Sequence, residues 1–319
     1  MALPKSVVIS EEGPREGFQI EKQLIPTDKK VALIDALSGT GLKYIQTVSF
    51  VSPNRVPNMV DADEVVSRIA LRPGVEYSAI WFNEMGLQRA VALRDRLTVV
   101  GKLRGYASDA FLEKNLNRKP GEHRAHTLNE ISRYKELGIP ITEASVTAAF
   151  GCNFSGDVPV ARLLSEIAAI KALVEEYDLP IESVSLADTM AWATPAGIRT
   201  AIGAIQDRFP EFGISLHLHD TRGMAIANAY AALEMGIRHF DAAVGGLGGC
   251  PFAAHKGAAG NICTEDLVFM CHEMGIETGI DLDALIECGQ FAEDVVGHPL
   301  PGAVKQGGSL TRLRQMLAK

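Results

Sequence analysis

The sequence has no run of hydrophobic residues near the length of about 18 to 20 residues that a helix needs to cross a bilayer. It has no run of basic residues either, and its formal net charge is −8. Surfaces that bind nucleic acid or anionic lipid carry clustered Lys and Arg. We therefore expect neither nucleic acid nor a membrane among its partners.

Cysteine is also scarce. The five cysteines form an odd set without a Cys-x-x-Cys pair: Cys152, Cys250, Cys263, Cys271 and Cys288. A disulfide framework uses an even number of cysteines, and a structural zinc site uses closely spaced pairs. The N-terminus shows no signal-peptide pattern, because one charged residue is followed directly by a strand-like run. These features predict a cytoplasmic protein with at most one reactive thiol.

What the sequence does contain is an alternation of apolar runs and helical patterns along 319 residues. The apolar runs predict strands at residues 7–9, 44–50, 76–82, 97–103, 141–149, 183–187, 214–219 and 239–244. The amphipathic patterns predict helices at residues 27–37, with Thr27 as N-cap, and at 61–71, 87–93, 126–137, 158–177, 195–208 and 225–233.

Strands that alternate with helices indicate a parallel sheet. Eight such units predict a (β/α)8 TIM barrel. A doubly wound open sheet is the alternative, and the lack of a G-x-G-x-x-G pattern after the first strand weakens it. No change in composition marks a linker, so we expect a single domain over residues 1–319. Within it, one or two extra helices should pack outside the barrel at about 281–319.

A pair of histidines stands out in the segment Ile214-Ser-Leu-His-Leu-His-Asp-Thr221. Residues two apart in a strand point to the same side, so His217 and His219 should face one way. Two imidazoles on one face can bind one metal ion. Two partly buried histidines with ordinary hydrogen-bond partners explain an isolated His-x-His pattern equally well.

Polar residues are concentrated where the expected strands end, which is where TIM barrels place their chemistry. These residues are Arg15, Glu16, Gln46, Ser49, Asn83, Ser108, Thr147, Asp188, His217 and His219. A Gly-rich loop with Cys250 follows the last strand, and Asn261 comes after it. This concentration favours a metal site at the histidine pair.

Five motifs occur in order along the chain: Glu12-Gly-Pro-Arg-Glu-Gly-Phe-Gln19, Thr47-Val-Ser-Phe-Val-Ser-Pro53, His217-Leu-His-Asp-Thr221, Gly245-Gly-Leu-Gly-Gly-Cys-Pro-Phe252 and Gly260-Asn-Ile-Cys-Thr-Glu-Asp266. Together they resemble the hydroxymethylglutaryl-CoA lyase family, and the resemblance runs from about residue 7 to 290. The loop with Cys250 is the most diagnostic, since the related synthases lack that cysteine.

The resemblance implies cleavage of the C2–C3 bond of a 3-hydroxyacyl-CoA to acetyl-CoA and a keto acid or ketone. It implies a divalent cation, Mg²⁺ or Mn²⁺, because oxygen and imidazole ligands suit these ions. The implied metal ligands are Glu16, His217, His219 and Asn261. The implied catalytic residues are Arg15 for the enolate oxygen, Cys250 on a lid loop as proton donor, His217, and Asp188 as a second-line candidate that could instead orient a histidine.

The acyl-CoA substrate is expected to contact further residues at the strand ends. These are Gln19, Gln46, Ser49, Asn83, Ser108 and Thr147, of which Asn83 and Ser108 are equally well explained as caps of loops. A homodimer or a higher homo-oligomer is the expected assembly.

The chain departs from the family pattern in the innermost residues. Glu16 stands where the family has Asp, and Gln46 stands where it has Glu. The segment 254–256 adds about two residues to the loop after Cys250. Loss of the charge at position 46 predicts an Arg15 that lacks its acidic neighbour, and hence a site retuned toward another 3-hydroxyacyl-CoA.

Two alternatives stay open. One is a homologue that binds metal and acyl-CoA without turnover. The other is an acetyl-CoA condensing enzyme of the same superfamily, which Cys250 and the lack of a C-terminal regulatory domain disfavour. Intact Arg15, His217, His219, Cys250 and Asn261 favour an active lyase.

Overall fold

The computed structural model describes residues 3–249 and 260–318. The described residues fall into two compact units, and each is described by itself. The middle unit consists of Val100–His239 with residues 3–4, and the terminal unit consists of Lys5–Val99, Phe240–Gly249 and residues 260–318. The expectation of a single domain stays a prediction.

All the expected strands are present among the described residues: β1 (Val8–Glu11), β2 (Tyr44–Ser49), β3 (Glu76–Ile80), β4 (Gly101–Tyr106), β5 (Ile141–Thr147), β8 (Ser183–Asp188), β9 (Gly213–Leu218) and β10 (His239–Ala242). Their order in the sheet is β3-β2-β1-β10-β9-β8-β5-β4. This is the order along the chain, resumed at β1 after β10. Such an order, with helices between successive strands, is that of the expected (β/α)8 fold.

In the middle unit, the ladders β4–β5, β5–β8 and β8–β9 are all parallel. The connecting helices are α5 (Asp109–Leu116), α6 (Pro120–Glu136), α7 (Val160–Tyr177), α8 (Pro195–Arg208) and α9 (Ala225–Glu234), and a short antiparallel pair, β6 (Gly151–Cys152) and β7 (Gly156–Asp157), follows β5. Burial alternates along β9, where Leu216 and Leu218 are fully buried on either side of a half-buried His217. The period of two therefore holds where the histidine pair was expected.

In the terminal unit, β1–β2 and β2–β3 are parallel ladders. Its helical segments before the last strand are η1 (Gly13–Gly17), α1 (Phe18–Ile20), α2 (Thr27–Ser38), η2 (Pro57–Met59), α3 (Ala62–Arg68) and α4 (Glu84–Ala92). After β10 come the turn η3 (Val244–Gly246) and α10 (Thr264–Glu273). Ala243, the residue after β10, forms an isolated parallel bridge with Cys263, the residue before α10.

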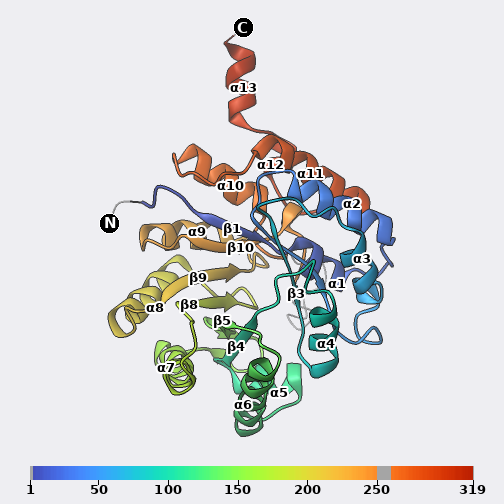
Figure 1. The fold of residues 1–319 in the computed structure, drawn as a ribbon. Helices are drawn as coiled ribbons and strands as arrows, with labels where there is room; N and C mark the ends of the chain where they lie inside the picture. Colours follow the sequence, from blue (N-terminus) through green and yellow to red (C-terminus); the bar gives the residue numbers. More distant parts are fainter. Residues whose placement is uncertain (1–2, 250–259, 319) are drawn as a thin grey trace. The chain divides into compact units, whose positions relative to one another are not determined.

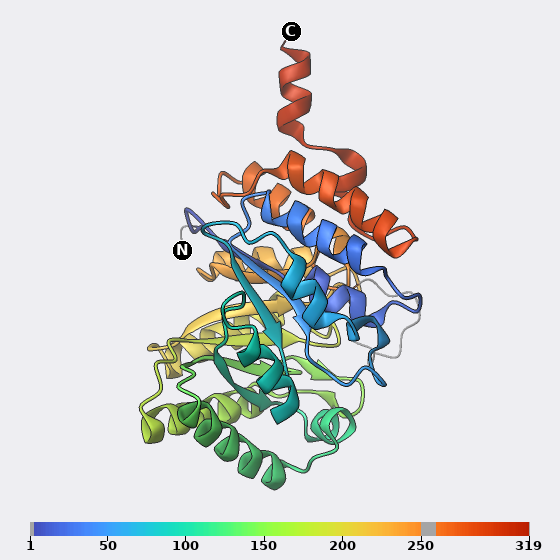
Figure 2. The ribbon, with the colours of Figure 1, turned by 45° about the vertical axis from the view of Figure 1, so that its right-hand side comes forward.

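The C-terminal extension holds three helices, α11 (Leu282–Val296), α12 (Val304–Gly307) and α13 (Leu310–Leu317), where one or two were expected. Helix α11 lies beside α2 (Figures 1 and 2) and buries one face, including Leu285. Helix α13 leads away from α12 (Figure 1) and has no buried residue.

Two local predictions were wrong. The N-cap of α2 is Pro26 rather than Thr27, because the Thr27 hydroxyl instead donates to Asp61 at 2.7 Å. The strand expected from residue 97 begins at Gly101, because Leu97 closes a turn after α4 through a bond from its N–H to the carbonyl of Leu93 at 3.0 Å. Leu97 is buried in that turn, and burial alone does not distinguish a turn from a strand.

Among the described helices, none is long and apolar enough to span a membrane.

Candidate active site

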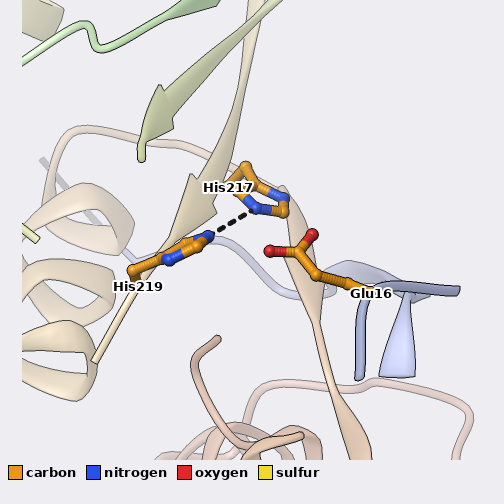
Figure 3. A group of neighbouring side chains, drawn as sticks. All are labelled: Glu16, His217 and His219. Atoms are coloured by element: carbon orange, nitrogen blue, oxygen red, sulfur yellow. Dashed lines mark hydrogen bonds between the residues drawn. The ribbon is translucent and has the colours of Figure 1, made fainter. Parts of the chain in front are cut away.

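The end of β9 brings the two histidines together as the strand period predicts. The Nε2 atoms of His217 and His219 lie 3.0 Å apart and the ring centroids 5.1 Å apart. Figure 3 shows both rings with the contact between them. His219 is 2% exposed. A neutral imidazole offers a lone pair on one nitrogen, so this pair can share a proton or bind a cation.

Asp188 ends the neighbouring strand β8 and is 1% exposed. Its Oδ1 accepts hydrogen bonds from the backbone N–H groups of Trp192 at 2.7 Å and Ala193 at 3.0 Å. Burial raises the pKa of Asp188 to about 6, although these bonds and the charge of His219 act against the rise. Asp188 therefore fixes the loop that follows β8 and influences His219 electrostatically, and its catalytic role stays a prediction.

The terminal unit carries Arg15 and Glu16 on η1, a π-helical turn directly after β1. Pro14 suits the second position of this turn because it has a fixed φ and no N–H that needs a partner. The N–H of Glu16 donates to the carbonyl of Glu12 at 2.8 Å. The turn thus places the side chains of Glu12, Arg15 and Glu16 in one compact group.

Two buried carboxylates hold η1 and η3 in place. Glu11 accepts from the N–H of Gly13 at 2.7 Å and of Val244 at 2.9 Å, and from the hydroxyl of Thr264 at 2.6 Å. Glu265 accepts from the N–H of Gly245 at 3.0 Å. Burial raises the pKa of Glu11 to about 8 and that of Glu265 to about 7. Sequence reasoning missed both residues, because nothing local distinguishes them from surface glutamates.

Arg15 does not lack acidic neighbours, and that expectation was wrong. Its guanidinium donates from Nε to Oε1 of Gln46 and from Nη2 to Oε2 of Glu12, while Nη1 lies 2.8 Å from Oε2 of Glu16. Burial lowers the pKa of Arg15, but the charges of Glu12 and Glu16, with a further contribution from Asp241, raise it overall. The missed residue is Glu12. The spacing of three residues between Glu12 and Arg15 was the available signal, since such pairs meet on a helical turn.

Glu16 and Asn261 come together beside Gly248 in the terminal unit. A Cβ atom at Gly248 would lie 2.9 Å from Nδ2 of Asn261 and 3.2 Å from Cγ of Glu16. Asn261 is 2% exposed, and both polar atoms of its amide lack a hydrogen-bond partner among the described residues. A buried amide costs free energy when nothing satisfies it. Asn261 therefore fits a ligand such as a metal ion.

The predicted substrate contacts differ in their surroundings. Asn83 and Ser108 cap helices, since each side chain accepts from a backbone N–H of α4 or α5, at 2.9 Å from Gly86 and 3.2 Å from Phe111. The Gln19 amide donates to the carbonyl of Arg15 at 3.0 Å. Two more sit at strand ends, Ser49 on β2 and Thr147 on β5. The substrate roles of these five residues and of Gln46 stay predictions.

Cys250, the predicted proton donor, lies outside the described residues. The other cysteines, Cys152, Cys263, Cys271 and Cys288, are buried free thiols. Burial raises the pKa of Cys271 and of Cys288 to about 12. Buried thiols with raised pKa values react slowly.

Comparison with known proteins agrees with this picture. The HMGL-like family model matches residues 6–292. Hydroxymethylglutaryl-CoA lyase YngG of Bacillus subtilis (strain 168) is 38% identical over 303 residues, which cover 94% of this chain and 97% of that protein.

Two solved structures extend the comparison to the fold. The crystal structure of the Bacillus subtilis HMG-CoA lyase matches with a TM-score of 0.86 and 36% identity, covering 96% of this chain and 99% of that one. The A. baumannii HMG-CoA lyase in complex with coenzyme A and 3-methylmalate matches with a TM-score of 0.83 and 37% identity, covering 97% of each chain. Fold and sequence together define a carbon–carbon lyase built on a TIM barrel. Within that class, the chain belongs to the HMGL-like family.

Proposed function

We propose that this protein cleaves the C2–C3 bond of a 3-hydroxyacyl-CoA resembling hydroxymethylglutaryl-CoA, and releases acetyl-CoA and a keto acid or ketone. The observation that carries the proposal is Arg15, whose side chain is 12% exposed and whose guanidinium has a partner at each of its three nitrogens, including the carboxylate of Glu16 at 2.8 Å. A fixed cation in a site with little water is suited to the negative charge that develops on a thioester enolate. Family membership over nearly the whole chain supports this choice.

The proposed ligands for a divalent cation are Glu16, His217, His219 and Asn261. Glu16 and the two histidines supply one carboxylate and two imidazoles, and Asn261 supplies a buried amide whose oxygen has no partner among the described residues. This donor set fits Mg²⁺ or Mn²⁺. When bound, such an ion lowers the pKa of an alcohol that it contacts and orients the substrate oxygens.

The chain's own residues would divide the reaction as follows. Asp188 takes the proton from the 3-hydroxyl group, because His217 has no free lone pair to accept it if it holds the metal. The electron pair of the O–H bond then forms the ketone at C3, and that of the C2–C3 bond forms the enolate. Arg15 holds the enolate oxygen, and Cys250 gives C2 the proton that completes acetyl-CoA. Proton transfer of this kind is most efficient when the pKa of the catalytic acid or base lies near the working pH.

Release of acetyl-CoA from a panel of 3-hydroxyacyl-CoAs, with and without added Mn²⁺, tests the proposal. Turnover of at least one thioester, stimulated by the metal, is the expected result. Binding of thioesters without any turnover would identify a catalytically altered homologue. Consumption of acetyl-CoA in the presence of a keto acid would identify a condensing enzyme instead.

A cysteine-directed experiment tests the proton donor. Iodoacetamide should modify Cys250 first, because four other cysteines are buried, and turnover should be lost in step with this modification. The Cys250→Ser variant should lose about a hundredfold or more in kcat, within the range for a general acid. Cys271→Ser, which removes a buried thiol, is the matched control. Full activity of Cys250→Ser would remove Cys250 from the mechanism.

The cytoplasmic location and the homo-oligomeric state expected from the sequence also stay predictions, and light scattering of the purified protein would decide the second.

A further inference from the structure

Glu12 is buried next to Arg15, and no role has been assigned to it. We propose that Glu12 is a positioning residue whose carboxylate balances the charge of Arg15, while the neutral Gln46 fixes the orientation of the guanidinium. The inference rests on the proposed function, because it takes Arg15 as the group that holds the enolate oxygen.

The geometry separates the tasks of the three partners. A guanidinium is planar and donates in fixed directions. Glu12 accepts from Nη2, Gln46 accepts from Nε, and Glu16 lies 2.8 Å from Nη1. Contacts on three different nitrogens define both the plane of the group and its rotation within that plane. Glu12 is thus the partner of Nη2, while Gln46 and Glu16 contact the other two nitrogens.

The charges separate the tasks further. The side chains of Arg15 and Glu12 are 12% and 10% exposed, so water screens their charges little. Glu16 is a proposed metal ligand, and the charge of a carboxylate on a divalent ion is largely compensated by that ion. Gln46 carries no charge. Glu12 is then the carboxylate in direct contact with Arg15 that continues to balance its charge, with a smaller contribution from Asp241. A buried cation without such a partner is strongly disfavoured.

This division of tasks explains how the charge and the orientation of Arg15 are maintained although residue 46 is a neutral glutamine. The charge is supplied from the turn after β1, and the orientation is supplied from β2. Two consequences follow. Neutralising Glu12 should impair the step in which Arg15 acts, and a carboxylate at position 46 should replace the missing one.

The test is a pair of substitutions measured singly and together. Glu12→Gln keeps a hydrogen-bond acceptor and removes the charge, so kcat should fall about tenfold or more while KM changes less than about threefold. Combined with Gln46→Glu, it should recover to within about threefold of the parent. Gln46→Glu alone adds a third carboxylate beside Arg15 and should not increase kcat. Glu64→Gln, which removes an exposed ion-pair partner of Arg68, is the matched control.

Each outcome decides between explanations. Unchanged kcat in Glu12→Gln, or a double variant that is folded yet no better than this single variant, would overturn the role of Glu12. If Glu12→Gln does not fold, Glu12→Asp and the double variant replace it in the test. The role of Glu12 would also be overturned if both of these variants fold but are inactive. If the parent cleaves no acyl-CoA, the proposed function fails. In that case the melting temperature and circular dichroism of the set should still show rescue of Glu12→Gln by Gln46→Glu if the charge pairing is correct.

Discussion

The end of β9 and the turn η1 both carry candidate catalytic residues, but the side chains are held in place in different ways in the two regions. His217 and His219 belong to a regular strand and its immediate continuation, where alternation alone sets their common direction. Arg15 and Glu16 belong to an irregular turn held by a buried carboxylate, Glu11, and by contact with η3. Residues of the first kind depend on the local backbone. Residues of the second kind depend on contacts with segments more than two hundred positions away.

The largest effect is expected at the regular strand. His219→Ala should lower the affinity for Mn²⁺ by more than about a hundredfold. Loss of the residues that only support a metal ligand already lowers affinity by about 10- to 100-fold, and loss of the ligand itself should lower it further. Titration calorimetry with Mn²⁺ alone measures this without any substrate. His239→Ala, at an exposed strand start, should bind the metal as the parent does. Equal affinity of the His219→Ala variant and the parent would mean that the histidine pair is only a buried polar contact.

The next largest effect is expected at Gly248, and it tests whether the position of Glu16 on η1 depends on close packing against this glycine. Gly248→Ala places a methyl group 2.9 Å from the amide of Asn261 and 3.2 Å from Glu16, at a backbone φ of +102°. Gly223→Ala is the matched control, because it has a positive φ of +68° and nothing within 4 Å of the new methyl group. Both should lose about 1–2 kcal/mol in the free energy of unfolding from backbone strain.

The two glycine variants should then differ in function. Gly248→Ala should lose about tenfold or more in kcat/KM and in metal affinity, because both candidate ligands beside it must shift. Gly223→Ala should keep both. If the two variants behave alike, the arrangement of Glu16 and Asn261 does not depend on this packing, and the contrast between β9 and η1 is smaller than proposed.

The contrast also explains what could be predicted from the sequence. The strands, and the shared face of His217 and His219, follow from a period that each segment carries in itself. The turn η1 does not, because π-helical turns are rare and have no composition of their own. Glu12 was therefore not considered as a partner of Arg15. Asn83 and Ser108 show a second limit, since a residue that caps a helix and one that binds substrate look the same in sequence.

A smaller effect concerns the buried carboxylate that holds η1. The pKa of Glu11 is raised from 4.5 to about 8, so its neutral form is favoured in the folded protein. Its contribution to stability is full below pH 4.5 and is lost as the pH rises through about 8. Glu11→Gln is permanently neutral and keeps an oxygen for Gly13 and Val244, while its NH₂ group can donate to the hydroxyl oxygen of Thr264.

The parent should therefore lose stability between pH 5.5 and 8.5 more steeply than Glu11→Gln, by a difference on the order of 2 kcal/mol. Urea unfolding across this range measures the two slopes. Glu265 and Asp188, whose pKa values are also raised, should leave a residual slope of the same sign in both proteins. Parallel curves would show that Glu11 is charged in the folded state, and that it holds η1 as an anion.

The smallest effect is expected where a segment has almost no tertiary contacts. Helix α13 has no buried residue, and in its ion pair with α10 the side chains of Arg314 and Glu273 are 62% and 27% exposed. An exposed pair of this kind contributes about 0–1 kcal/mol, and a helix of this length is marginal by itself. Removing residues 310–319 keeps Ser309 and its bond to Asp283, so the melting temperature should change by less than about 3 °C.

Leu285→Ala gives the scale for this last comparison, because Leu285 is fully buried on α11 and its truncation should lower the free energy of unfolding by about 2–5 kcal/mol. The shortened chain should also keep its kcat/KM. Four exposed apolar side chains lie on α13: Leu310, Leu313, Met316 and Leu317. If removal of the helix destabilises the protein as much as Leu285→Ala does, these side chains must be covered in solution. Light scattering of the two proteins at several concentrations would then show whether a second copy of the chain covers them.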